Sequence, residues 1–182
     1  MSINIQVFEE TGAPVNGRGT VTEIDNFNWK NTSDVSQPYF SYPLRRPLKA
    51  PDQTNSFKRF IFFKISGTYS YIKNVKIIAE IGAGKQATKT QLFYKFSSNY
   101  VEPTADFDGE MINADNLSKS IVWHPNLGDS PILATSRPII IGPNATVYSE
   151  YFVSQIRVNK GEWNDVGNTD EFKFKLSLQE FE

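Results

Sequence analysis

The residues of this chain that are best suited to chemistry are one histidine and one short run of acids. His124 lies between Trp123 and Pro125 and is the only histidine in the sequence. A Ser-His-Asp triad needs a histidine as its base, and a zinc site needs several histidine, cysteine or carboxylate ligands. A lone histidine more often packs or faces solvent, so the sequence predicts neither a triad nor a zinc site.

The acidic run is an alternation of acids with a glycine at 106–110. Asp106, Asp108 and Glu110 alternate with Phe107 and Gly109. Calcium loops use oxygen ligands at alternate positions and a glycine for the turn, so this run is a fragment of such a loop. A full loop needs more ligands in register and flanking helices, which the sequence around it does not provide. We interpret the run as a solvated acidic turn and leave calcium at Asp106 and Asp108 open.

Two glycine-containing segments have part of the spacing of a phosphate-binding loop. The first, Gly12 to Arg18, lacks the Lys and the Ser or Thr, and in the second Gln86 follows Lys85 where Ser or Thr is needed. A glycosidase needs two carboxylates that face one cleft, and no pair stands out. We expect no catalytic residue, no metal and no cofactor; a hydrolase or lyase that uses Asp or Glu is the third functional hypothesis.

The composition predicts a single globular domain over residues 1–182. Hydrophobic residues make up 39% of the chain and charged residues 21%, as in folded rather than disordered proteins. The net charge of -1 gives no long-range field for nucleic acid or an anionic membrane. The absence of cysteine fits a reducing compartment. Met1–Gln6 shows no signal peptide, and the longest apolar run, Phe60 to Phe63, is too short to span a bilayer.

The most apolar part of the chain, Phe57–Ile81, predicts two adjacent core strands around which the rest is arranged. In the first strand, Ile61 and Phe63 share a face, whereas Phe60 and Phe62 lie on the opposite face. Such a strand is either covered on both sides or presents Phe60 and Phe62 to another subunit.

The spacing of apolar residues in the second segment fits either a strand or a helix. Ile72, Val75 and Ile78 lie three residues apart, which also fits a helix. The β-branched residues favour a strand, because they lose rotamer freedom in a helix and pack well on a sheet.

Shorter strands surround this pair, and no convincing helix is present beyond one possible turn at 112–119. The fold class predicted is an all-β antiparallel β-sandwich of the jelly-roll or immunoglobulin-like kind, with long loops. The other predicted strands are Ser2–Phe8, Thr20–Ile24, Gln91–Phe96, Ile121–Trp123, Arg137–Ile141, Val147–Val158 and Glu171–Phe181.

A long proline-rich loop at about 25–55 is the first candidate for an interface. Prolines at this density exclude a helix, and loops of this length are often functional or ordered by a partner. The candidate interface residues, in this loop and on the first core strand, are Trp29, Tyr39, Phe40, Tyr42, Arg45, Arg46, Phe60 and Phe62.

Three stretches resemble small β-sandwich structural proteins of tailed-bacteriophage virions, which decorate the head or build neck and tail accessories. They are the start at Ser2–Val7, the loop Tyr42–Pro47, and the closing region from Tyr151 to Leu176. The resemblance implies a non-enzymatic protein that packs against neighbouring virion subunits. It also implies a homo-oligomer or a lattice-bound subunit, assembled in the host cytoplasm and located in the virion.

The second hypothesis is a carbohydrate-binding module. Aromatic residues are 14% of the chain, and several lie in predicted loops, where they could stack on sugar rings. The candidates for that stacking platform are Trp29, Tyr39, Tyr42 and Trp163.

Overall fold

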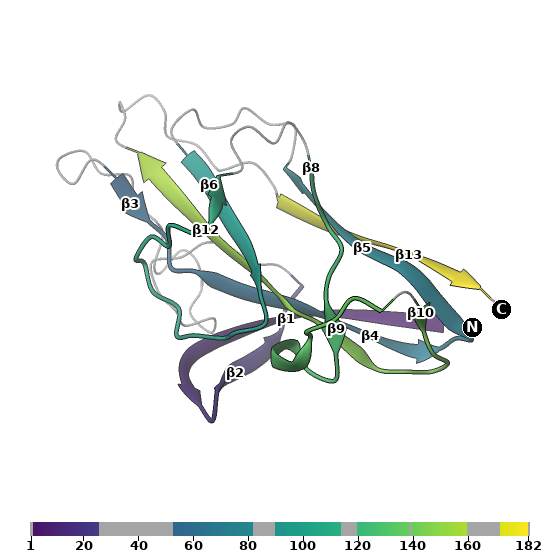
Figure 1. Ribbon diagram of the computed structural model, residues 1–182. Coiled ribbons are helices and arrows are strands. Elements are labelled where there is room, and N and C mark those ends of the chain that lie inside the picture. The colour runs from purple at the N-terminus through teal and green to yellow at the C-terminus, as the bar shows by residue number, and fades with distance from the viewer. Residues whose placement is uncertain are drawn as a thin grey trace.

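A computed structural model describes residues 2–25, 53–81, 90–113, 120–138, 140–159 and 172–181. The predicted all-β antiparallel sandwich is confirmed: the strands form two antiparallel sheets that face each other across a hydrophobic core (Figure 1). The described ranges contain no α-helix, only the 3-10 turn η1 at Pro131–Leu133. None of the described helical structure is long and apolar enough to cross a membrane.

The larger sheet contains most of the strands. Its main path, in spatial order, is β2 (Arg18–Glu23), β1 (Ser2–Val15), β4 (Arg59–Thr68), β12 (Tyr151–Asn159), β6 (Thr90–Ser97) and β7 (Ile112–Asn113). Three short strands join this path: β3 (Gln53–Asn55) pairs with β12, β11 (Val147–Ser149) pairs with β4, and β9 (Leu127–Gly128) pairs with β11.

The smaller sheet is built around β5 (Tyr71–Ile81). Along one edge β5 pairs over its full length with β13 (Phe172–Phe181). The two short strands β8 (Ser120–Trp123) and β10 (Ile140–Ile141) pair with different parts of β5 and therefore share its other edge. Both described chain ends lie at the same end of the sandwich, because Ser2 pairs with Thr68 and Phe181 with Tyr71 (Figure 1).

The two predicted core strands, β4 and β5, follow each other in the sequence but do not pair. They belong to different sheets and face each other across the core. Ile61 and Phe63 point from β4 toward Ile77 of β5 and Trp123 of β8. This arrangement covers the inner face of the large sheet.

The outer face of β4 is also buried, which corrects one expectation. Phe60 and Phe62 are each only 2% exposed, so they are core residues and not a surface for another subunit. They pack against Tyr151 and Tyr100, the latter from the connection that follows β6. Burying a phenylalanine side chain is worth about 1.5–3 kcal/mol, and the chain obtains this internally by laying that connection over the sheet.

A β-bulge explains the helix-like spacing in β5. Asn74 has a positive φ of 54°, and β5 has one residue more than β13 between the pairs Lys76–Ser177 and Lys73–Gln179. The extra residue shifts the alternation, so that Ile72 and Val75 are both buried. On β13 the irregularity lies between Ser177 and Gln179, and pairing continues to Phe181.

A second bulge divides the predicted strand Val147–Val158 into β11 and β12. Between the pairs Tyr148–Lys64 and Phe152–Ile61, this strand has one residue more than β4. The Phe63 N–H, which faces the bulge, donates to Ser149 Oγ at 2.9 Å. A side chain therefore replaces the backbone acceptor that the bulge removes.

We predict that the core and the surface respond differently to the same truncation. Ile61→Ala should lower the free energy of unfolding by about 2–5 kcal/mol, because Ile61 is 0% exposed between the sheets. The control is Ile140→Ala, at a position 50% exposed, and it should stay within about 0.5 kcal/mol of the parent. Urea unfolding measures both, and equal losses would contradict this assignment of the core.

Candidate functional site at the hairpin of β1 and β2

The hairpin of β1 and β2 projects from the end of the large sheet (Figure 1). Both strands are longer than the predicted Ser2–Phe8 and Thr20–Ile24, because β1 continues to Val15 and β2 begins at Arg18. Asn16 and Gly17 form the turn with φ values of 53° and 78°. Positive φ at both central residues is the geometry of a type I′ turn, for which Asn-Gly is the preferred sequence.

A buried carboxylate anchors this hairpin to the sheet. Glu10 is 0% exposed and accepts hydrogen bonds from Arg18 Nε at 2.9 Å, Gly19 N at 2.6 Å and Tyr151 Oη at 2.6 Å. Arg18 Nη2 also donates to Glu10 Oε2 at 2.9 Å, so the guanidinium binds the carboxylate in a bidentate manner. The negative charge of Glu10 is thus compensated by groups inside the fold.

The same contacts fix the protonation states in this cluster. The hydrogen bond with Glu10 raises the pKa of the Arg18 guanidinium. Burial, followed by the hydrogen bond to Glu10, raises the pKa of the Tyr151 hydroxyl. Burial also raises the pKa of the Tyr100 hydroxyl, whose oxygen donates to Gly12 O at 2.7 Å. Both tyrosines therefore stay protonated and act as hydrogen-bond donors rather than as bases.

Gly19 is required for this close packing. A Cβ at that position would overlap the Thr11 carbonyl oxygen and the Tyr100 hydroxyl. The hairpin therefore lies tightly against the Tyr100 side chain. Beyond this anchor, apolar residues are presented to solvent: Val15 is 73% exposed and Val21 40% exposed.

A second buried acid lies on the opposite face of β1. Glu9 is 0% exposed and forms an ion pair with Arg59 of β4, which is 2% exposed. Burial lowers the pKa of Arg59, and the charge and hydrogen bond of Glu9 oppose that effect. Such a pair holds strands in register, whatever its net contribution to stability.

A third buried acid fixes the bulge between β11 and β12. Glu150 Oε1 accepts from Trp123 Nε1 at 3.2 Å and from Asn126 N at 2.9 Å, and Oε2 accepts from Asn126 Nδ2 at 3.1 Å. This links the turn after β8 to the large sheet. The neighbouring His124 is exposed and belongs to none of these three acid clusters.

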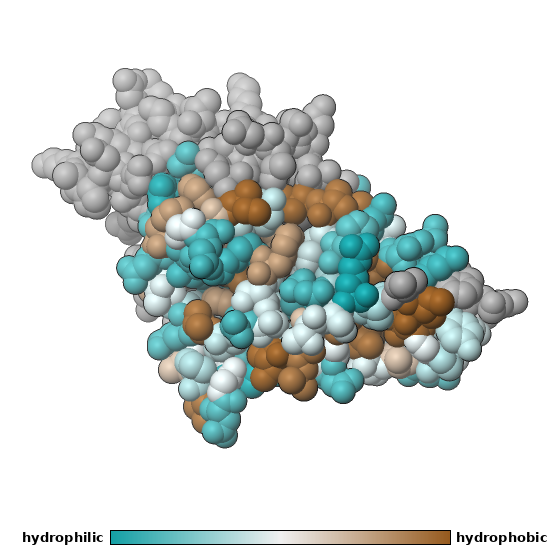
Figure 2. All heavy atoms as spheres, in the orientation of Figure 1, coloured by the Kyte–Doolittle hydropathy of each residue, from teal (hydrophilic) through white to brown (hydrophobic). Residues whose placement is uncertain are grey.

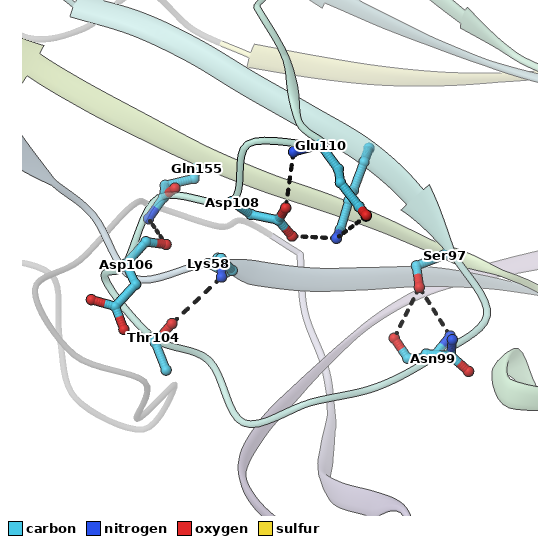
Figure 3. A network of polar contacts seen from close by, with 9 residues as sticks. Lys58, Ser97, Asn99, Thr104, Asp106, Asp108, Glu110 and Gln155 are labelled. Atoms are coloured by element: carbon cyan, nitrogen blue, oxygen red, sulfur yellow. Dashed lines mark hydrogen bonds and ion pairs between the residues drawn. The ribbon is translucent and has the colours of Figure 1, made fainter.

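The acidic run at 106–110 is held by a lysine ammonium group and by one backbone N–H (Figure 3). Lys95 Nζ forms an ion pair with Asp108 and lies 3.5 Å from Glu110 Oε2. The Glu110 N–H donates to Asp108 Oδ1 at 3.0 Å. The bond from Lys95, with that from the Glu110 backbone, holds the pKa of the Asp108 carboxyl below its usual value. The Lys95 ammonium group therefore lies between the Asp108 and Glu110 carboxylates, whereas Asp106 is exposed.

The rest of this turn packs on the sheet through Gln155 and Lys58 (Figure 3). Gln155 Nε2 donates to the backbone oxygens of Ser56 at 2.7 Å and Ala105 at 3.2 Å. Lys58 Nζ lies 3.5 Å from Thr104 Oγ1. In the part of the chain that the structure describes, no group of three or more His, Asp or Glu side chains could hold a metal ion.

Several predicted interface residues lie outside the described residues. These are Trp29, Tyr39, Phe40, Tyr42, Arg45 and Arg46, together with Trp163 of the proposed sugar platform. Of the surface that is described, Figure 2 shows one face, on which hydrophobic residues form several separate groups with hydrophilic residues between them.

Sequence reasoning missed the three buried glutamates and their partners. For Glu10 a signal was present: Asn16-Gly17 between Val15 and Arg18 is the strongest short hairpin signal. If Asn16-Gly17 is interpreted as a hairpin turn, the two flanking strands become longer and Arg18 comes near Glu10. Comparisons with protein-family models, with curated proteins and with solved structures found no match.

We predict that the Tyr151 hydroxyl stabilises the hairpin anchor. Tyr151→Phe should lower the free energy of unfolding by about 1.5–3 kcal/mol, the range for a hydrogen bond to a charged group. The control is Tyr148→Phe, since Tyr148 packs against Phe62 in the same cluster but its hydroxyl donates to no other described residue. Denaturant unfolding of both variants measures the difference, and equal effects would show that the bond to Glu10 contributes nothing.

The ion pair of Asp108 predicts a pH dependence of stability. Its pKa is lower in the folded protein, so its stabilisation is present above the usual aspartate pKa, about 3.9. It is lost as the pH falls through the folded value. Asp108→Asn should therefore be less stable than the parent at pH 7, by up to about 1 kcal/mol, and equally stable at pH 2.

The control for this pH series is Asp129→Asn, because Asp129 is exposed on the turn after β9. It should leave stability unchanged at both pH values. A deficit of Asp108→Asn that persists at pH 2 would assign the effect to packing instead of charge.

Proposed function

We propose that this chain is a non-enzymatic structural protein of a bacteriophage virion. In this role it packs against neighbouring subunits as a capsid decoration or as a head, neck or tail component. Its partners would be other virion structural proteins, in a homo-oligomer or on a lattice, with assembly in the host cytoplasm. The virion part of the proposal rests on the resemblance of Ser2–Val7, Tyr42–Pro47 and Tyr151–Leu176 described above.

The structural role is supported by the partners of the buried glutamates, which all lie within the chain. Glu10 binds Arg18, Gly19 and Tyr151, Glu9 pairs with Arg59, and Glu150 binds Trp123 and Asn126. A catalytic acid or base needs a polarised group that reaches the substrate. These carboxylates instead join strands and connections to one another.

The projecting hairpin supports the same proposal from the outside of the molecule. It is anchored by Glu10 and Tyr100 and presents Val15 and Val21 to solvent. An anchored element with exposed apolar side chains suits contact with another protein, since little conformational entropy remains to be lost on binding.

The experiment that tests the proposal is an inventory of particles of the phage that encodes the chain. Particles purified by density gradient should contain the chain at a fixed ratio to the major capsid protein across fractions. That ratio should survive a high-salt wash and nuclease treatment, because protein contacts rather than nucleic acid would hold the chain. An abundant host cytosolic protein, quantified in the same fractions, is the control for carry-over. A chain found in the lysate but absent from washed particles would contradict the proposal.

A further inference from the structure

Strand β2 has one edge that no other described strand covers. Within the described ranges β2 pairs with β1 alone. All four residues from Thr20 to Glu23 are exposed. An uncovered edge carries unpaired N–H and C=O groups and is a template for another strand.

The register shows which backbone groups point outward. The Ile24 N–H donates to Val7 O at 2.9 Å, so the amide of Ile24 faces β1. Amide groups alternate in direction along a strand. The backbone N–H and C=O groups of Thr20 and Thr22 therefore also point toward β1. Those of Val21 and Glu23 point toward the open edge.

The side chains of β2 favour strand pairing over protection. Thr20, Val21 and Thr22 are β-branched residues, which pack well on a sheet. Native edges are commonly protected by lysine, proline or other charges. In β2 the charged residues are only the two at its ends, Arg18 and Glu23, and the four residues from Gly19 to Thr22 include no charge and no proline.

We propose that β2 pairs antiparallel with β2 of a second copy of this chain, about a two-fold axis centred on Val21. The contact would extend the large sheet of one copy into that of the other, as an isologous interface. This inference rests on the proposed function and deepens it, because it names the surface through which copies of a structural protein join.

The chemistry of the edge selects the register. Centred on Glu23, the pairing would place two carboxylates opposite each other, which is unfavourable. Centred on Gly19, it would need an N–H that already donates to Glu10. Centred on Thr22, it would place Val21 opposite Glu23. Centred on Val21, it joins two exposed valines and brings Glu23 beside Gly19 and Arg18 of the second copy.

The first test removes the outward N–H of Val21, for which no hydrogen bond to another described residue is present. Val21→Pro should raise the dimer dissociation constant at least about 30-fold, since two symmetric hydrogen bonds are lost. Val21→Thr keeps the N–H and the β-branched shape, so it should dimerise nearly as well as the parent. Sedimentation and light scattering over a concentration series measure the masses, and circular dichroism checks that each variant is folded.

The second test uses the absence of cysteine from the chain. In the proposed register the two copies of residue 21 are a directly opposed pair, with Cα atoms about 5.5 Å apart, within disulfide reach. Val21→Cys should therefore form a disulfide-linked dimer under mild oxidation. The matched control is Val122→Cys, at a position 53% exposed on the small sheet, and it should stay monomeric on a non-reducing gel.

Three results would overturn the proposal: a parent chain that is monomeric at every concentration, a Val21→Pro variant that is folded and associates as the parent does, or equal cross-linking at positions 21 and 122. These results are independent of the particle inventory. A chain present in washed particles but monomeric in solution would refute the β2 contact and leave the structural role standing. A chain that dimerises through β2 but is absent from particles would support the β2 contact and refute the role in the virion.

Discussion

Side chains alternate along a strand, and in β1 this constraint places two consecutive glutamates on opposite faces of the large sheet. Both Glu9 and Glu10 are fully buried, and a buried carboxylate is costly unless it is paired and hydrogen-bonded. Arg59 of β4 meets Glu9 on the inner face, and Arg18 of β2 meets Glu10 on the outer face. The two pairs therefore fix β1 against both of its neighbours.

This arrangement makes the register of β1 strict. A shift by one residue would exchange the faces of Glu9 and Glu10 and would turn Phe8 from Phe62 toward the interior between the sheets. Each carboxylate would then lie away from its arginine. The hairpin geometry follows from the same constraint, because Arg18 and Gly19 reach Glu10 only when the turn falls at Asn16 and Gly17.

The sequence predicts the strands and the sandwich because alternation is a local property. The two apolar faces of β4 were visible from Phe60 to Phe63, and the β-branched residues of β5 identified a strand despite its bulge. Which sheet each strand joins could not be predicted in this way. The pairings of β1 with β4 and of β5 with β13 join residues distant in the chain, and no local pattern records them.

The candidate site was predicted less well, for a physical reason. Sequence reasoning sought interfaces among large aromatic residues and so selected Phe60 and Phe62. Large aromatic residues gain most from burial, and the connection after β6 buries these two within the same chain. The open edge of β2 depends instead on backbone groups, which every residue possesses and which only the pairing pattern reveals.

The pairing of β5 with β13 has a consequence for the order of folding. β5 lies in the first half of the chain, whereas its full-length partner β13 is formed by residues 172–181. On the ribosome, β5 emerges long before β13 exists, so one of its edges stays open until β13 has been made. Contacts of such long sequence separation form slowly, and exposed edges are prone to aggregation in the interval. The small sheet therefore closes long after β5 has been translated, and the nascent chain depends on β13 to cover that edge.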